Sequence, residues 1–303
     1  MATPTLRQLN AFLATVEAGS VSAAARLLNV TQPAISQQLR ELERMLGLRL
    51  LERAGGHTLP SSAGHALLVH ARRTRQAVED LMAAAEARRG GETGRVRLGT
   101  GATACIYYLP PVLARMKQRM PGIEVIIAIG NTPEIVRSLE AGELDAAVIT
   151  LPAPLGRSLT SRELCVDPLV AYLPETMVPG RTTTALRPSQ IAALPLILYE
   201  RGSGTRNIVD AWFRRTGLAP RPIMALGSVE AIKVLVGGGL GATILPELAV
   251  QVATPGLAVL PLRPRLARKL GVVLRREKLR DRALRLFLEE LERQKVHRSP
   301  EYS

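Results

Sequence analysis

Hydrophobic residues in the first 60 positions recur every three or four residues, which is the period of a helix with one buried face. The first such stretch runs from Leu6 to Ala18 and is followed by Gly19, a residue suited to ending a helix. Thr5 and Gln8 have the spacing of a capping box at its start. The pattern therefore predicts an amphipathic helix over 6–18.

Two further helices are predicted over 22–46, separated by a tight turn. In the first helix, Ala24, Leu27 and Leu28 are expected to face inward, and Asn29 can take the left-handed conformation that ends a helix. The second begins after Thr31, the expected N-cap, and ends at Gly47. Its apolar residues are Ile35, Leu39, Leu42 and Leu46. This arrangement predicts a helix-turn-helix.

The second of these helices carries hydrogen-bonding side chains on its other faces. These residues are Gln32, Pro33, Ser36, Gln37 and Arg40. Proline in the first turn costs no hydrogen bond, and amides, a hydroxyl and a guanidinium near a helix start are the groups that contact bases and phosphates in a major groove. The alternative is a solvated face, with Arg40 paired to Glu41 or Glu43. We interpret it as a DNA-reading helix.

A short strand and turn are expected next, followed by a long helix. Residues 48–53 and the Gly55-Gly56-His57 stretch have the pattern of a short strand and turn, as in the wing of a winged helix. The helix is predicted over 62–89, with Ala63, Leu67, His70, Ala77, Leu81 and Ala84 or Ala85 near one stripe. Because a lone helix of this length must bury its stripe, we expect it to pair with a second copy of the chain. Residues 90–94, rich in glycine, predict a hinge.

After residue 94 the pattern changes to alternating strands and helices. Predicted strands lie at 96–98, 123–129, 144–149, 169–173, 196–199, 223–226, 242–245 and 258–260. Predicted helices lie from the 99–103 loop to 119 and at 132–140, 205–216, 229–236 and 280–296. The alternation predicts parallel sheets covered on both faces, joined by crossover strands near 164–170 and 268–274. The apolar run at 123–129 is expected to be a buried strand.

Several small polar residues follow predicted strands or precede predicted helices. They are Thr100, Gly101, Thr103, Asn131, Thr132, Thr150, Ser203, Gly204, Thr205 and Ser228. In open α/β sheets ligands bind at the carboxyl ends of strands, and helix N-termini attract anions. Each residue taken singly could be only a helix cap. Together they predict a site for a small anionic metabolite, with Arg201 and Arg206 as further contacts or solvated surface.

The Gly99–Ala104 loop also resembles a dinucleotide fingerprint. That motif requires an acidic residue at the end of the second strand, where this chain has Gly130 and Asn131. A nicotinamide-dependent enzyme is therefore not predicted. Since no nucleophile, base and orienting group can be assembled either, we expect no enzyme, no cofactor and no catalytic residue.

Composition limits the class of protein. A chain of 303 residues with 47% hydrophobic and 22% charged residues has room for two or three globular domains. No apolar run is long enough for a membrane span, and the N-terminus lacks a secretion signal, so the expected location is cytoplasmic, without membrane contact. The four histidines are not clustered, so no metal site is expected. Cys105 and Cys165 lack paired spacing, although a redox role stays open.

The positive charge is uneven along the chain. Of the net charge of +14, residues 1–93 carry +3 (11 basic, 8 acidic), residues 94–261 carry +4 (16 and 12) and residues 262–303 carry +7 (13 and 6). Half of the excess thus lies far in sequence from the helix-turn-helix. An arginine-rich solvated surface explains it as well as attraction to nucleic acid does.

The chain resembles the LysR-type transcriptional regulators of bacteria. The resemblance rests on Leu6–Phe12, Gly19–Ala24, Thr31–Ser36, Leu42-Glu43, Gly47, Leu50–Arg53 and Ala63-Gly64, and in the C-terminal part on 202–206, 227–232 and 239–246. It implies a homodimer or homotetramer on double-stranded promoter DNA. By match, Gln32, Pro33 and Ser36 would face bases and backbone in the groove, and Arg53 would reach phosphate or the minor groove from the wing. RNA polymerase is a further candidate partner. The chain departs from the family at Gln37, where arginine is frequent, and at the wing residues 55–57, which are often basic.

The fold class expected is an all-α winged helix-turn-helix domain (1–61), a linker and dimerisation helix with hinge (62–93), and a two-lobed α/β effector domain like periplasmic binding proteins (94–303). Lobe I would comprise 94–166 and 268–303, and lobe II 167–267. The function expected is DNA binding modulated by a metabolite between the lobes. A solute-binding or transport component is the alternative, since the C-terminal part alone would qualify.

Overall fold

The computed structural model describes residues 3–88, 93–180, 182–278 and 281–297. These residues form two compact units, one containing α1 to α4, β1, β2 and the segment Glu140–Glu143, and the other containing the rest from β3 onward. Most of the predicted hinge at 90–94 lies outside the described residues.

The first unit begins with the three predicted helices, α1 (Leu6–Ala18), α2 (Val21–Leu27) and α3 (Gln32–Leu46). The capping box is confirmed, since Gln8 N donates to Thr5 Oγ1 and Thr5 N donates to Gln8 Oε1. Gly19 and Gly47 end α1 and α3 in the left-handed conformation. Asn29 also has a positive φ, as predicted. These local signals set the three helix boundaries.

Some predicted contacts in this unit are wrong. The core between the helices is formed by Phe12, Leu13, Ala24, Ala25, Ile35, Leu39, Leu42 and Leu50, whereas Leu27, Leu28 and Leu46 are exposed. Because α2 is only two turns long, its two small alanines are enough to bring it against α1 and α3. Thr31 takes the extended N-cap conformation, but its side chain makes no cap hydrogen bond.

The wing is an antiparallel hairpin of β1 (Leu51–Ala54) and β2 (His57–Pro60). Its two-residue turn, Gly55-Gly56, has positive φ at both positions, the geometry that favours glycine in tight hairpins. Glu43 Oε1 accepts hydrogen bonds from Leu50 N at 2.7 Å and Leu51 N at 3.3 Å, which attaches the hairpin to α3. The start of the wing is therefore attached to α3.

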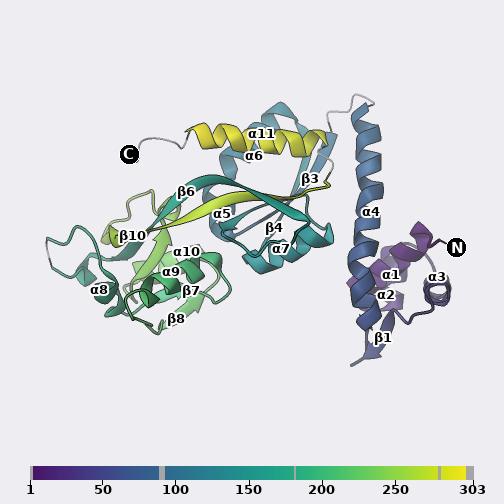
Figure 1. Ribbon diagram of the computed structural model, residues 1–303, viewed down its shortest axis with the longest axis horizontal. Coiled ribbons are helices and arrows are strands. Elements are labelled where there is room, and N and C mark those ends of the chain that lie inside the picture. The colour runs from purple at the N-terminus through teal and green to yellow at the C-terminus, as the bar shows by residue number, and fades with distance from the viewer. Residues whose placement is uncertain (1–2, 89–92, 181, 279–280, 298–303) are drawn as a thin grey trace. The chain divides into compact units, whose positions relative to one another are not determined.

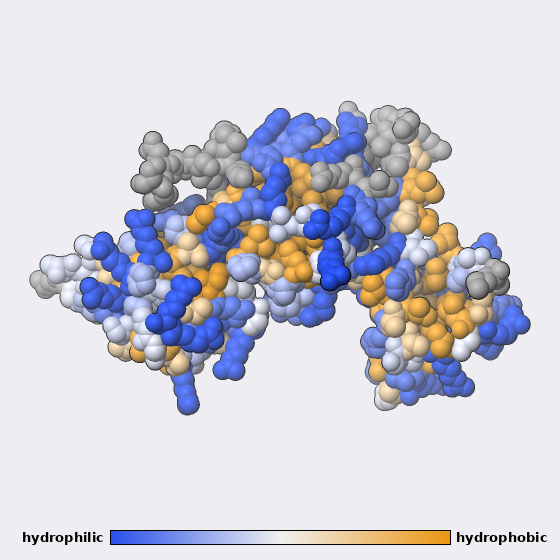
Figure 2. Space-filling model, in the orientation of Figure 1, coloured by the Kyte–Doolittle hydropathy of each residue, from blue (hydrophilic) through white to orange (hydrophobic). Residues whose placement is uncertain are grey.

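The long helix α4 covers Ser62–Arg88, close to the predicted 62–89. Its first half packs against the N-terminal core through Leu67, Leu68 and Ala71. Beyond this contact Leu81 and Met82 remain 67% and 58% exposed. Figure 2 shows further apolar side chains at the surface of this unit.

The second unit is built on a six-stranded sheet in the order β4-β3-β5-β10-β6-β9. Its strands are β3 (Thr93–Thr100), β4 (Gly122–Ile129), β5 (Ala146–Leu151), β6 (Leu159–Pro174), β9 (Thr243–Pro246) and β10 (Leu257–Arg275). A separate parallel pair is formed by β7 (Ile197–Tyr199) and β8 (Met224–Leu226). The long antiparallel strands β6 and β10 run through both lobes (Figure 1). They are the predicted crossover strands.

The helices of this unit cover both faces of each lobe. They are α5 (Ala102–Tyr107), α6 (Pro110–Arg119), α7 (Thr132–Ala141), α8 (Pro188–Ala192), α9 (Gly204–Arg214), α10 (Val229–Gly237) and α11 (Arg282–His297). In lobe I, α6 and α11 cover one face of the sheet and α7 covers the other. In lobe II, α8 and α9 lie on one face and α10 on the other. The two-lobed α/β architecture is confirmed.

Three predictions about the second unit are wrong in detail. The helix predicted from the 99–103 loop to 119 is divided into α5 and α6 at Pro110-Pro111, since proline removes helix hydrogen bonds. Strand β4 is an edge strand, with Ile126 and Ile129 exposed, and not a buried one. The six-stranded sheet is mixed and not parallel, because β6 and β10 are antiparallel to their neighbours.

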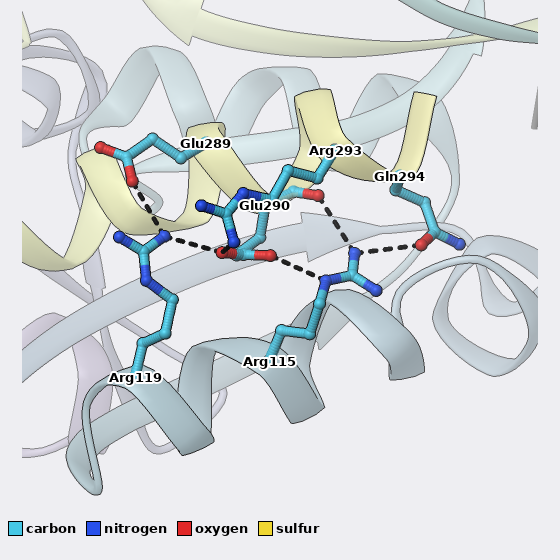
Figure 3. A network of polar contacts seen from close by, with 6 residues as sticks. All are labelled: Arg115, Arg119, Glu289, Glu290, Arg293 and Gln294. Atoms are coloured by element: carbon cyan, nitrogen blue, oxygen red, sulfur yellow. Dashed lines mark hydrogen bonds and ion pairs between the residues drawn. The ribbon is translucent and has the colours of Figure 1, made fainter. Parts of the chain in front are cut away.

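The packing of α11 on α6 includes a network of charged groups (Figure 3). Glu290, whose side chain is fully buried, accepts from Arg115 Nε at 2.7 Å and from Arg119 NH1 at 2.7 Å. Arg293 lies 3.3 Å from the same carboxylate, and Arg115 also donates to Gln294 Oε1 at 3.0 Å. The network joins the C-terminal helix to lobe I.

Candidate functional site

The polar side chains of α3 are presented at the surface of the first unit. Gln32, Pro33, Gln37 and Arg40 are exposed, and Ser36 is half-buried. Ser22 Oγ donates to Gln32 Oε1 at 3.2 Å, which leaves the amide N–H₂ of Gln32 as a donor. The arrangement matches a helix that places its N-terminal residues against base edges.

The ion pairs considered for Arg40 do not form. Glu41 accepts from Gln37 Nε2 at 2.9 Å, and Glu43 is occupied by the wing backbone. Within the part of the chain that the structure describes, the Arg40 guanidinium has no acidic partner and remains exposed, as phosphate binding requires. Gln37 uses one N–H of its amide on Glu41, which leaves its second N–H and its oxygen for contact with a base.

Arg53 is exposed on β1 of the wing, directly opposite Thr58 on β2. The wing turn itself carries two glycines and the exposed His57. The hairpin is attached at its other strand, because Thr58 N donates to Gly19 O at 2.8 Å. Arg53 is therefore the fixed cationic group of the wing.

In the second unit a cavity of about 290 Å³ lies between the two lobes. Its walls come from the N-terminal turn of α5, the carboxyl ends of β4, β5 and β7, the N-terminal turn of α9 and the floor strand β10. The predicted residues that line it are Gly101, Thr103, Asn131, Thr132, Thr150, Ser203, Gly204 and Thr205. Segments separated by more than 100 residues thus meet in one cleft.

The lobes approach each other closely at Gly204. A Cβ atom at this position would lie 3.0 Å from Thr150 Cβ and 3.4 Å from Thr132 Oγ1. The first turn of α9 therefore faces the strand ends of lobe I, and its backbone N–H groups point out of the helix toward the cleft. A side chain at this position would require Thr150 to move by a few tenths of an ångström, so glycine permits the closest approach.

Two predicted ligand residues are placed elsewhere. Thr100 does not line the cavity, because it is fully buried and its hydroxyl donates to Val148 O at 2.9 Å within the sheet. Ser228 does not line it either; its hydroxyl accepts from Ala231 N and caps α10, while the adjacent Gly227 is the lining residue. Both hydroxyls serve the fold, and we correct the predicted list accordingly.

Three other predicted residues, Asn131, Thr205 and Arg206, form hydrogen bonds within the protein. Asn131 caps α7, since its Oδ1 accepts from Glu134 N at 3.0 Å. Thr205 Oγ1 accepts from Arg268 NH1 at 3.1 Å. Arg206 is buried and donates to Asp210 Oδ1 and to Tyr199 O, so its guanidinium is held within the protein, whereas Arg201 is exposed.

Sequence reasoning missed four charged or aromatic residues of the cleft: Glu134, Tyr199, Glu200 and Arg268. Arg268 is buried in the floor, where it forms an ion pair with Asp167 through Nε and NH2, both at 2.8 Å. Their positions are 101 residues apart, so no local pattern reveals the pair. Glu200 directly follows β7, a position at which a polar residue could have been noticed.

Burial affects two titratable side chains near the cleft. Desolvation raises the pKa of Tyr199 to about 12, so its hydroxyl, 3.2 Å from Thr103 Oγ1, stays protonated. Desolvation also raises the pKa of the Cys105 thiol, which reduces its reactive thiolate fraction. Cys105 and Cys165 are free thiols and half-buried. These properties disfavour a redox site at Cys105.

The described residues include no group of three or more His, Cys, Asp or Glu side chains placed to hold a metal ion. Nor does any helix in the described ranges combine the length and apolarity needed to cross a membrane.

Comparison with known proteins identifies both units. Residues 6–65 match the family model for bacterial regulatory helix-turn-helix proteins of the lysR family, and residues 89–295 match the LysR substrate binding domain. The chain belongs to the LysR family of transcriptional regulators. It is thus a DNA-binding regulator with an effector-binding domain, and not an enzyme.

Individual LysR proteins are similar over most of the chain. The transcriptional activator CmpR of Synechocystis is 32% identical, covering 86% of this chain and 85% of the relative. The uncharacterised regulator YeiE of Escherichia coli K12 is 33% identical, covering 94% and 96%. The crystal structure of the LysR regulator CbnR is 25% identical with a TM-score of 0.69, covering 96% and 99%. The crystal structure of full-length CbnR with its target DNA has a TM-score of 0.68 at the same identity and coverage.

Proposed function

We propose that this LysR protein binds promoter DNA through α3 and the wing, as a homodimer or homotetramer, and that a small anionic metabolite in the interlobe cleft modulates this binding. The DNA contacts proposed are Gln32, Pro33, Ser36, Gln37, Arg40 and Arg53. The ligand contacts proposed are Gly101, Thr103, Asn131, Thr132, Thr150, Ser203, Gly204 and Thr205.

The observation that carries the ligand proposal is the approach of α9 to lobe I. Ser203, Gly204 and Thr205 present the N-terminus of an 11-residue helix, which has unpaired N–H groups and a partial positive charge. Thr132 and Thr150 add hydroxyl groups from the opposite wall. Donors from both sides favour a compact carboxylate, sulfate or phosphate group.

Charged side chains in the cleft narrow the chemical class of the expected ligand further. Arg268 is neutralised by Asp167, so it adds no net charge to the floor. Glu134 Oε2 accepts from Asn131 N at α7, and Glu200 also lines the cavity. Two carboxylates are poor neighbours for a polyanion but good acceptors for hydroxyl or amino groups. We therefore expect a small anion that also carries hydrogen-bond donors.

A thermal-shift panel tests the ligand class. The probes are inorganic sulfate, inorganic phosphate, and small mono- and dicarboxylates with and without hydroxyl groups. At least one should raise the melting temperature with saturable concentration dependence. Stabilisation only by cationic or apolar compounds would contradict an anion site.

A pair of serine variants locates that response. Ser203 lines the cleft at the start of α9, whereas Ser228 caps α10 outside it. Ser203→Ala should raise the probe concentration needed for half-maximal stabilisation. Ser228→Ala should lower the melting temperature through loss of a cap but leave that concentration unchanged.

A gel-shift assay on the intergenic DNA upstream of the gene tests the DNA proposal. Retarded complexes that survive competition by unrelated duplex are expected. Equal competition by unrelated duplex would contradict sequence-specific binding.

A further inference from the structure

The short helix α5 connects the cleft to the second lobe. Its first turn, Gly101 to Ala104, lines the cavity from the side of lobe I. Its last residue, Tyr107, reaches α10 of lobe II. Thr103 and Tyr107 are four residues apart and therefore lie on the same face of the helix. The same face of α5 therefore carries a residue that lines the cleft, Thr103, and a residue that contacts lobe II, Tyr107.

Both residues bond to lobe II. The Tyr107 hydroxyl donates to Glu230 Oε1 and accepts from Lys233 Nζ at 2.8 Å. Lys233 Nζ also lies 5.2 Å from the centre of the Tyr107 ring, and 3.5 Å from Glu230 Oε2. One turn earlier, Thr103 Oγ1 is 3.2 Å from the Tyr199 hydroxyl on β7. Tyr107 is consequently the centre of a three-residue polar cluster between the lobes.

The environment keeps the phenol in its neutral, donating form. Partial burial, followed by the hydrogen bond and the negative charge of Glu230, raises the pKa of Tyr107 above its usual value. A neutral phenol can donate to Glu230 and accept from Lys233 at once, whereas phenylalanine can do neither. The cation–π contact of Lys233 needs only the ring.

Covalently, the lobes are joined in part by β6 and β10, whose pairing is irregular between Pro261 and Leu266. A change in this short connection can alter the angle between the lobes, since domain closure uses a few residues at the ends of elements. Tyr107 packs against the buried cluster that contains Val170 and Tyr172 of β6, so the α5 contacts lie close to this crossover strand. They are placed to limit such a rotation.

We propose that Tyr107 is a positioning residue of the effector cleft, which holds α5 against α10 and thereby sets the separation of the lobes. A molecule that contacts Gly101 or Thr103 then acts on the same helix that joins the lobes. The biological meaning of this device rests on the proposed effector site. The separation of the lobes can be measured without any effector.

The proposal is tested by measuring the distance between a label on lobe I and a label on lobe II in the full chain. Gln118→Cys on α6 and Arg214→Cys on α9, both exposed positions, carry spin labels in a Cys105→Ala, Cys165→Ala background. Labelled chain is diluted with excess unlabelled chain, so that only distances within one chain contribute. Electron–electron double resonance then gives the distance distribution.

Tyr107→Phe should broaden the distribution and shift its mean by on the order of 2 Å or more, the size of a domain rearrangement. Glu230→Gln should have a smaller effect, since an amide oxygen still accepts from the phenol. Lys233→Met, which removes the other partner, provides an independent second variant. Glu163→Gln is the matched control, because Glu163 forms an exposed ion pair with Lys269 at 2.8 Å on the crossover strands.

An unchanged distribution in both Tyr107→Phe and Lys233→Met, even with a lower melting temperature, would show that the cluster only stabilises the fold. A shift without any anion response would support the lobe contact and contradict the proposed ligand class. The two proposals can therefore fail separately.

Discussion

Gln32 occupies the first position of α3, where a side chain projects beyond the helix start. Its carbonyl oxygen is held by Ser22, and its N–H₂ group is free to turn outward. Because an amide oxygen can accept two hydrogen bonds, a glutamine held by Ser22 still has the acceptor and donor that a bidentate contact to adenine uses. Its role in DNA recognition is therefore testable by a single side-chain deletion.

Gln32→Ala is expected to weaken specific DNA binding by roughly 1–3 kcal/mol if the contact is bidentate. Gln38→Ala is the matched control, because Gln38 lies on the same helix outside the polar face formed by Gln32, Ser36, Gln37 and Arg40. Fluorescence anisotropy at fixed salt, with specific and unrelated duplexes, measures both variants. Wild-type discrimination in Gln32→Ala would exclude a base contact at this residue.

Gly64 is required by a close contact between α4 and the wing. A Cβ atom there would lie 2.1 Å from Leu50 O. In an open helix position, Gly→Ala would stabilise by up to about 1 kcal/mol through helix propensity, so the sign of the effect is informative.

Gly64→Ala is expected to destabilise the first unit by about 1–3 kcal/mol, the usual cost of overpacking. Gly237→Ala in α10, where the nearest contact is 3.8 Å, should be neutral or slightly stabilising. Urea unfolding followed by circular dichroism compares them. Stabilisation by Gly64→Ala would mean that α4 shifts readily away from the wing.

Among the elements, α11 depends on the buried carboxylate of Glu290. Burial alone would raise its pKa, but hydrogen bonds from Arg119 and Arg115 outweigh burial and lower the pKa below its usual value. A carboxyl with a lowered pKa contributes stability above its unfolded pKa and loses it as the pH falls through the folded pKa. The attachment of α11 should therefore weaken in acid.

Glu290→Gln is expected to cost about 2 kcal/mol at neutral pH, because it leaves two partly hydrated arginines without their buried partner. The difference from wild type should shrink progressively as the pH falls below the ordinary glutamate pKa of about 4.3 and through the lower pKa of the folded state, because the wild-type carboxyl is then protonated too. Glu289→Gln, an exposed partner of Arg119, should change stability by less than about 0.5 kcal/mol. A difference independent of pH would contradict the ionised state of Glu290.

The helix α4 leaves a row of residues exposed on one side. His70, Ala77, Leu81 and Ala85 belong to the predicted stripe and are exposed, whereas Leu67 is half-buried against the N-terminal core. A charged residue at position 67 would therefore disturb the folding of the N-terminal core. A charged residue at position 81 tests whether two copies of the chain pair through α4. We still propose that this row contacts a second copy.

Leu81→Glu is expected to lower the molar mass measured by light scattering, because it places a charge in an apolar seam. Leu81→Met keeps volume and polarity similar and should preserve the mass. An unchanged mass in Leu81→Glu would show that other surfaces hold the copies together.

On the scale of the whole molecule, the DNA-binding helix and the ligand cleft belong to different compact units. A metabolite can regulate DNA binding only through a coupling free energy between them, and that coupling acts equally in both directions. We propose that metabolite binding changes how the subunits pack against one another, and that this change in packing couples the cleft to DNA binding.

For a stabilising anion found in the panel, the dissociation constant for promoter DNA should change by a factor of about 5–150 at saturation. Saturating DNA should change the affinity for the anion by the same factor. Anisotropy and calorimetry measure the two directions. If neither affinity changed when the other ligand was bound, the cleft would bind the anion without regulating DNA binding.

Much of the architecture could be predicted because its signals are local. Caps at Thr5, Gly19 and Gly47 set helix ends, and the strand–helix alternation indicated a two-lobed α/β domain. Burial was harder to predict: the apolar run in β4 is an exposed edge, since edge position depends on strand order and not on composition.

The sequence by itself determined the helix-turn-helix, the wing turn and the strand ends that approach the cleft, because each depends on residues a few positions apart. Only the tertiary structure decided which hydroxyls line the cleft. Thr100 and Thr150 look alike in sequence, yet one bonds to Val148 O inside the sheet and the other faces Gly204. The pairs Arg268–Asp167 and Tyr107–Glu230 likewise join residues more than 100 positions apart. Such contacts depend on how strands and helices pack, and no local pattern encodes them.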